Sequence, residues 1–135
     1  MDNTLSNSIM SILTATTAIT SKLDTFVIGS TTYYAIFKGR MIPAMYQELN
    51  RTLQLYRVSI ISSHDINEVL YSISCRSTSE SASEDLAKAV YEATNRVMTE
   101  HNGLPVYFRT SVLQAIMETE NLWNTPVEIR TTNRS

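Results

Sequence analysis

Apolar and polar residues alternate along two neighbouring stretches in the middle of the chain. The apolar members of the two runs are Tyr56, Val58 and Ile60, then Val69, Tyr71, Ile73 and Cys75. A period of two places such side chains on one face of a β-strand. Because residues 62–67 between the runs are mostly turn formers, the pattern predicts an antiparallel β-hairpin with one buried face.

The residues after this hairpin have the period of an α-helix. Ser81 and Glu84 have the spacing of a capping box, which marks a helix start. Apolar residues then recur at steps of four, three and four, as one stripe along a helix: Leu86, Val90, Ala93 and Val97. The opposite side carries alternating charges typical of a solvated face: Glu84, Lys88, Glu92 and Arg96. Tyr91 lies beside these charges, so it either covers the edge of the core or contacts a partner.

The first third of the chain predicts a helix, a strand and an ambiguous segment. Residues 4–23 have an apolar helical face, although their threonines are poor helix formers. Residues 32–37 predict a strand with two apolar faces, one of which carries Tyr33 and Phe37, so its second face is either covered or an interface. Residues 41–52 fit either a short helix or an irregular segment that exposes Met45 and Tyr46.

The last third of the chain also leaves alternatives open. Residues 106–117 alternate like a strand but also contain a capping-box spacing, and β-propensity favours a strand over 105–113. A polar turn is expected over 118–124, where Trp123 is either core filler or an exposed anchor of an interface. A last strand is predicted at 127–130, and residues 131–135 are expected to be a loose tail.

These elements predict a single α+β domain over residues 1–135. We expect one antiparallel or mixed sheet of about four to five strands, with two main helices packed on one face.

Charge and composition narrow the classes of partner. The net charge is −2 and the 11 basic residues are scattered along the sequence, which argues against nucleic acid as a tightly bound partner. There is no apolar run of 18 residues and no basic N-terminal leader, so neither a membrane span nor a secretory signal is expected. The single cysteine excludes an internal disulfide, and Cys75 is expected to be a buried, unreactive thiol.

No catalytic, metal or cofactor site is predicted. His64 and His101 lie in predicted loops without metal-ligand spacing, and a turn accounts for His64 and Asp65. The three glycines are isolated, so no phosphate-binding loop is present. We therefore expect a non-enzymatic protein. A small enzyme or ligand-binding domain, with a pocket under residues 41–52, is the alternative from another class.

The order of predicted elements resembles the tail terminator, or tail-completion, proteins of long-tailed bacteriophages. The resemblance rests on the strand Tyr71–Arg76, the short polar link and Ala-rich helix up to Val90, and the closing strand Thr125–Arg130. Residues 41–52 depart from the family pattern.

This resemblance implies a structural virion protein with no catalytic residues. It would form a homo-oligomeric ring, usually of six copies, assembled in the host cytoplasm. The ring would cap the tail tube and join it to the head–tail connector protein, with DNA only passing through its lumen. Another neck protein, either a head-completion protein or a tube-like ring subunit, is the alternative. The candidate contact residues for subunits or partners are Tyr33, Phe37, Met45, Tyr46, His64, Asp65, Leu70, Tyr91 and Trp123.

Overall fold

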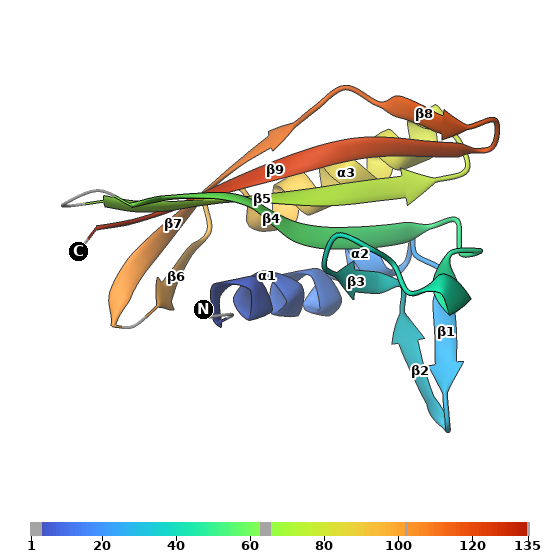
Figure 1. Cartoon of the computed structure of the whole chain (residues 1–135), viewed down its shortest axis with the longest axis horizontal. Helices are drawn as coiled ribbons and strands as arrows, with labels where there is room; N and C mark the ends of the chain where they lie inside the picture. Colours follow the sequence, from blue (N-terminus) through green and yellow to red (C-terminus); the bar gives the residue numbers. More distant parts are fainter. Residues whose placement is uncertain (1–3, 63–65, 102, 135) are drawn as a thin grey trace.

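A computed structural model describes residues 4–62, 66–101 and 103–134 (Figure 1). The helices are α1 (Thr4–Ala15), α2 (Thr17–Thr20) and α3 (Glu80–Thr94), together with a 3-10 helix, η1 (Ala44–Tyr46). The strands are β1 (Thr25–Ile28), β2 (Thr31–Tyr34), β3 (Ile36–Lys38), β4 (Thr52–Ser62), β5 (Ile66–Ser77), β6 (Met98–His101), β7 (Leu104–Val112), β8 (Ile116–Thr119) and β9 (Leu122–Arg134).

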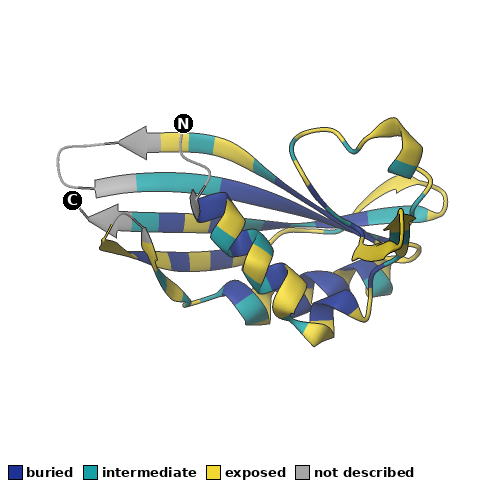
Figure 2. Cartoon of the chain, turned by 90° about the horizontal axis from the view of Figure 1, so that it is seen from below, coloured by how far each residue is buried: buried dark blue, intermediate teal, exposed yellow. Residues whose placement is uncertain are grey.

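The main sheet has seven strands in the order β3-β4-β5-β9-β7-β6, with β8 paired to β9. The β3–β4 pair is parallel and the other pairs are antiparallel, so the sheet is mixed. It curls into a half-barrel, and the helices cover one of its faces (Figure 2). The predicted α+β class with a mixed sheet and two main helices is confirmed, but the expected four to five strands are too few.

Two local features explain why the sequence predicts fewer strands than the structure contains. The predicted strand over 32–37 is divided at Ala35, so that β2 pairs with β1 in a separate two-stranded sheet while β3 joins the main sheet. Ala35 is fully buried and its backbone N–H donates to Asp24, while its carbonyl accepts from Leu53. The short strands β6 and β8 were not predicted, because four residues are too few to show a period.

The central hairpin is formed by β4 and β5, as predicted. The register shifts between Arg57 and Ser59, so Tyr56 lies opposite Ser72 whereas Ile60 lies opposite Val69. The prediction that Tyr56, Val58 and Ile60 share one face is therefore wrong, because a β-bulge changes which face alternate residues occupy. Over residues 52–60 of β4, the buried apolar side chains are instead Leu53 and Leu55.

The first helix ends earlier than predicted. Residue 16 separates α1 from α2, and the extended backbone of Thr16 (φ −93°, ψ 107°) interrupts the helix. Its hydroxyl donates to the carbonyl of Ile12 at 2.7 Å, a local bond through which threonine competes with helix geometry. The predicted apolar face is nevertheless buried in the core, through Leu5, Ile9, Leu13, Ile19 and Leu23.

The start of α3 differs from the predicted capping box. The N-cap is Ser79, whose hydroxyl accepts a hydrogen bond from the Ala82 backbone N–H at 3.2 Å, and Ser81 lies inside the first turn. The apolar stripe is confirmed, since Leu86 and Val90 are buried in the core. The helix ends at Thr94, so Arg96 lies beyond it and does not extend the row of helix charges.

The end of the chain belongs to the sheet. β7 confirms the strand predicted over 105–113, and residues 113–115 link it to β8. β9 is much longer than the predicted strand at 127–130 and includes residues 131–134, which were expected to be a tail. It lies between β5 and β7 and pairs with both, which buries Val127 and Ile129 completely.

Candidate functional site

An aromatic cluster joins the β1–β2 hairpin to the segment 41–52. The ring of Phe26 lies 5.7 Å from Tyr33, 5.6 Å from Phe37 and 4.4 Å from Tyr46, measured between centroids. Such spacings are favourable for aromatic pairs. Three of the predicted contact residues are therefore neighbours, with Phe37 buried, Tyr46 half-buried and Tyr33 exposed. Sequence reasoning missed Phe26, which is the ring that connects them.

The base of this hairpin is held by Asp24. Its carboxylate accepts from the backbone N–H groups of Asn50 and Arg51, both at 3.0 Å, and forms an ion pair with the Arg51 side chain at 2.7 Å. Burial by itself raises the pKa of Asp24. The backbone hydrogen bonds and the Arg51 charge outweigh that effect, so the pKa lies below its usual value.

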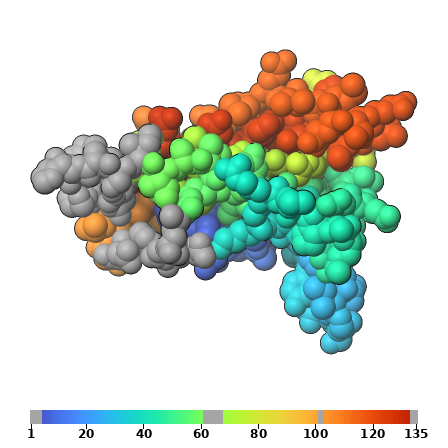
Figure 3. Space-filling model, in the orientation of Figure 1, coloured from blue at the N-terminus to red at the C-terminus, as the bar shows by residue number. Residues whose placement is uncertain are grey.

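The hairpin β1–β2 projects from the body of the molecule (Figures 1 and 3). Its exposed apolar side chains are Val27, Ile28, Tyr33 and Tyr34. Met41 and Met45, in the segment beside it, are more than three-quarters exposed. Of the two interpretations of residues 41–52, the irregular segment is the better one, since its regular structure is limited to η1. Folding alone gives these apolar side chains little to pack against.

A second exposed apolar surface lies where β7 leads into β8. It consists of Val112, Leu113, Ile116 and Met117, and sequence reasoning missed it. Trp123 lies in β9 opposite Met117 and is half-buried, rather than in a polar turn. An ion pair between Arg76 and Glu118 at 2.6 Å holds β8 to the sheet. In Figure 1, β8 and the β1–β2 hairpin lie on opposite sides of the molecule.

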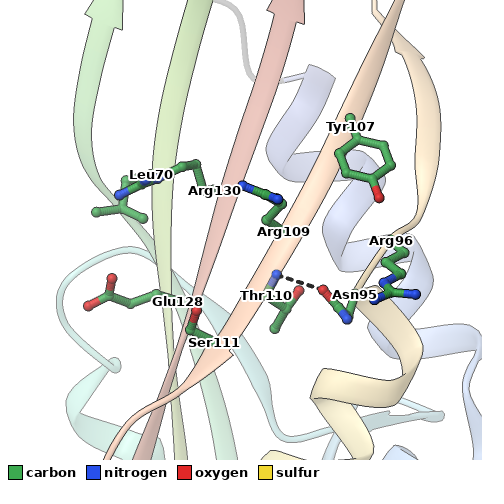
Figure 4. Close-up of a pocket in the computed structure, with 9 residues that line it drawn as sticks. All are labelled: Leu70, Asn95, Arg96, Tyr107, Arg109, Thr110, Ser111, Glu128 and Arg130. Carbon is green, nitrogen blue, oxygen red and sulfur yellow. Dashed lines mark hydrogen bonds between the residues drawn. The ribbon is translucent and has the colours of Figure 1, made fainter.

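The face of the sheet opposite the helices has a hollow of about 520 Å³, which we call the arginine hollow (Figure 4). Its lining comes from β5, β7, β9 and the two residues that follow α3, and consists of Leu70, Asn95, Arg96, Tyr107, Arg109, Thr110, Ser111, Glu128 and Arg130. The hollow places Leu70, one of the predicted contact residues, directly beside Arg130.

Two arginines of the hollow are cross-strand neighbours. Arg109 of β7 lies directly opposite Arg130 of β9. Like charges in such positions destabilise a sheet. Arg130 is neutralised by Glu68, whose carboxylate lies 3.0 Å from its Nε. In the described part of the chain, Arg109 has no corresponding acidic partner.

Tyr91 lies on the exposed side of α3 and accepts a hydrogen bond from the Asn95 side chain at 3.0 Å. The side-chain oxygen of Asn95 accepts a hydrogen bond from the Thr110 backbone N–H at 3.1 Å, which connects the end of α3 to β7. The predicted contact residues His64 and Asp65 lie outside the described residues.

The chemistry of the described residues is limited. Cys75 is completely buried, and burial raises the pKa of its thiol, so this thiol is protonated at neutral pH, in agreement with the sequence prediction. Among residues 4–62, 66–101 and 103–134, no group of three or more His, Cys, Asp and Glu side chains is placed to hold a metal ion. Nor does any helix in these ranges have the length and apolar character needed to cross a membrane.

Comparisons with known proteins identify the fold. No protein-family model matches the chain, and no curated protein sequence matches it. Among solved structures, the chain is similar to a chain in the virion of a native gene transfer agent (GTA) particle, with a TM-score of 0.61 and 12% sequence identity. The similarity covers 94% of this chain and 92% of the other. The protein therefore has the fold of a component of a GTA virion.

Proposed function

We propose that this protein is a structural component of a phage-like virion. The observation that carries the proposal is the shared fold, which extends over almost the whole of both chains. Because fold alone does not define function, the proposal also rests on the exposed surfaces of the molecule.

The exposed apolar surfaces support a role in assembly. The hairpin surface around Val27 and the β7–β8 surface around Ile116 lie on different sides of the molecule. Exposed apolar patches commonly mark protein–protein contacts. A subunit that contacts neighbours on more than one side is suited to a ring, because different surfaces meet in a head-to-tail arrangement.

The specific role that we propose is that of a tail terminator. Copies of the chain form a ring, of six subunits in the simplest case, that caps the tail tube and joins it to the head–tail connector. DNA passes through the ring. The support for this finer assignment is the order of elements: an N-terminal helix, a hairpin leading into α3, and closing strands. The nine predicted contact residues remain proposals for its interfaces.

Electron microscopy of particles that lack this protein tests the assignment. Over-long tails, or tails that are not joined to heads, are the expected result. Filled heads that leak DNA would instead assign a head-completion role. Normal particles without the protein would contradict a structural role altogether.

The mass of the purified protein provides a second test, measured alone and with tail tube protein. A ring mass in either condition is expected. A strict monomer in both conditions would argue against a ring subunit, even allowing for subunits that assemble only on their partner.

A further inference from the structure

The arginine hollow has an unbalanced positive charge in a chain whose net charge is negative. It contains Arg96, Arg109 and Arg130, with Glu128 as the acidic residue of its lining. Glu68 forms an ion pair with Arg130 only. Arg96 and Arg109 are exposed, and within the described residues neither has an ion-pair partner. The hollow therefore has two free guanidinium groups available for carboxylates of a partner.

The position of Arg96 depends on an uncommon backbone conformation. Its φ is +64°, in the left-handed region that a residue with a side chain seldom adopts. The backbone N–H of Arg96 donates to the Phe108 carbonyl at 3.0 Å, which holds this conformation against β7. The turn places Arg96 in the lining of the hollow, where Figure 4 shows it beside Asn95 and across β7 from Arg109.

Helix α3 carries the complementary charge. The outward face of α3 exposes Glu80, Glu84, Asp85 and Glu92, with Lys88 among them. Its inward face, through Leu86 and Val90, packs on the sheet from the side that the hollow does not occupy. We call these five charged residues, Glu80, Glu84, Asp85, Lys88 and Glu92, together with Tyr91, the acidic helix face.

The two surfaces are complementary in charge. The arginine hollow has three cations and one anion in its lining, and the acidic helix face has four anions and one cation. Each also carries exposed or half-buried apolar groups: Leu70 and Tyr107 in the hollow, and Tyr91 on the helix. A polyphosphate would be repelled by Glu128, whereas a protein face with a cation in it would not. The mixed charge of the hollow therefore favours a protein partner over nucleic acid.

We propose that the arginine hollow of one subunit binds the acidic helix face of the next copy of this chain. Because the two surfaces differ from each other, the contact is head-to-tail and closes into a ring when the rotation allows. The inference rests on the proposed ring function and names the surfaces that form the ring. It also explains the cost of placing Arg109 opposite Arg130, since a carboxylate from the neighbour relieves the repulsion.

Charge reversal tests this contact. The hollow variant carries Arg96→Glu and Arg109→Glu, which leaves the Arg130–Glu68 ion pair intact. The helix variant carries Glu84→Lys and Glu92→Lys. The matched control carries Lys38→Glu and Arg40→Glu, two exposed cations that neither line the hollow nor lie on α3. Mass is measured by analytical ultracentrifugation, with tube protein added if the unmodified chain needs it to assemble. Thermal unfolding checks that each variant is folded.

Each reversed variant alone should assemble only at a protein concentration about tenfold or more higher than the unmodified chain, because like charges then meet. An equal mixture of the two reversed variants should recover assembly, since opposite charges meet again at every contact. The control should assemble normally.

A ring of unchanged stability from the hollow variant would overturn the inference while leaving the proposed function intact. In that case, loss of binding to a duplex DNA probe by this variant would identify nucleic acid as the occupant, and loss of tail joining in particles would identify another virion protein. Failure of the unmodified chain to form any oligomer, alone or with tube protein, would overturn both proposals.

Cross-linking tests the same contact without reversing the charge of either surface. A chain with both Arg109→Cys and Glu84→Cys, treated with a short bis-maleimide, should give a ladder of covalent multimers. Either substitution alone should give no multimers, because a head-to-tail contact joins two different surfaces. The native Cys75 is completely buried and does not interfere. Dimers from a single-cysteine variant, or no ladder from the double variant in an assembled ring, would contradict the proposal.

Discussion

The two faces of the β7–β9 strand pair differ in what holds their residues in place. On the face toward the helices, Val106, Phe108, Val127 and Ile129 are completely buried. On the opposite face, Tyr107 is 38% exposed, and Arg109 and Arg130 face each other across the strands. The same backbone thus carries one face that is buried on folding and one exposed face on which two like charges are cross-strand neighbours. Substitutions on the first should change stability, and substitutions on the second should change assembly.

The largest effect is expected for Phe108→Ala, which removes the ring of a completely buried residue. The free energy of unfolding should fall by about 3–5 kcal/mol, from lost burial and the cavity left behind. Denaturant unfolding measures the change. Tyr107→Ala, one residue away on the open face, should cost far less. Equal losses for the two variants would contradict the distinction between the faces.

A smaller effect with a defined pH dependence is expected for Asp24→Asn at the base of the hairpin. The variant should lose about 1–2 kcal/mol at neutral pH, because backbone and Arg51 donors bind a carboxylate more strongly than an amide. The pKa of Asp24 is lowered in the folded state, so the ionised carboxylate stabilises the fold above its unfolded pKa of about 3.9.

This contribution is lost as the pH falls through the lowered pKa of the folded state. The difference in stability between the unmodified chain and Asp24→Asn should therefore shrink below about pH 4. Thermal unfolding at a series of pH values measures it. A difference independent of pH would show that the charge of Asp24 is not what matters.

A loss of about 1 kcal/mol is expected for Ser79→Ala, which removes the N-cap of α3. Ser81→Ala is the matched control, because Ser81 lies in the first turn and alanine is a better helix former there. Chemical unfolding of the two variants separates the cap that the structure contains from the one that sequence spacing predicts. A larger loss for Ser81→Ala would contradict the observed helix start.

The smallest effect on stability, within about 0.5 kcal/mol, is expected for Val27→Ser combined with Ile28→Ser at the exposed end of the hairpin. Thermal unfolding should hardly change, whereas incorporation into particles should fall if this surface contacts a partner. Thr31→Ser, at an exposed polar position on the same hairpin, is the control. Normal incorporation of the double variant would show that the hairpin surface has no assembly role.

Periodicity was sufficient for the elements that bury one face. The central hairpin, the stripe of α3 and the strand β7 follow from alternation or helical spacing, because burial demands a regular pattern. It failed where a single residue changes the geometry. The bulge after Arg57 and the break at Thr16 leave the apolar pattern intact and are therefore invisible in it.

The candidate surfaces depended more on tertiary structure. Tyr33, Phe37 and Tyr46 were singled out separately, and only the ring of Phe26 brings them together. Leu70 and Tyr91 were predicted as contacts without any relation between them. The structure places Leu70 in the arginine hollow and Tyr91 on the acidic helix face, where it is hydrogen-bonded to Asn95 at the edge of the hollow.

The sequence by itself determined the α+β class, the hairpin leading into a helix, and a buried thiol at Cys75, because each follows from local spacing and the need to bury apolar groups. Only the tertiary structure decided the strand order. The insertion of β9 between β5 and β7 brings Arg130 opposite Arg109, and the left-handed turn at Arg96 adds a third cation. Basic residues that are scattered along the sequence become one charged surface, because pairing between distant strands is set by the whole core and not by neighbouring residues.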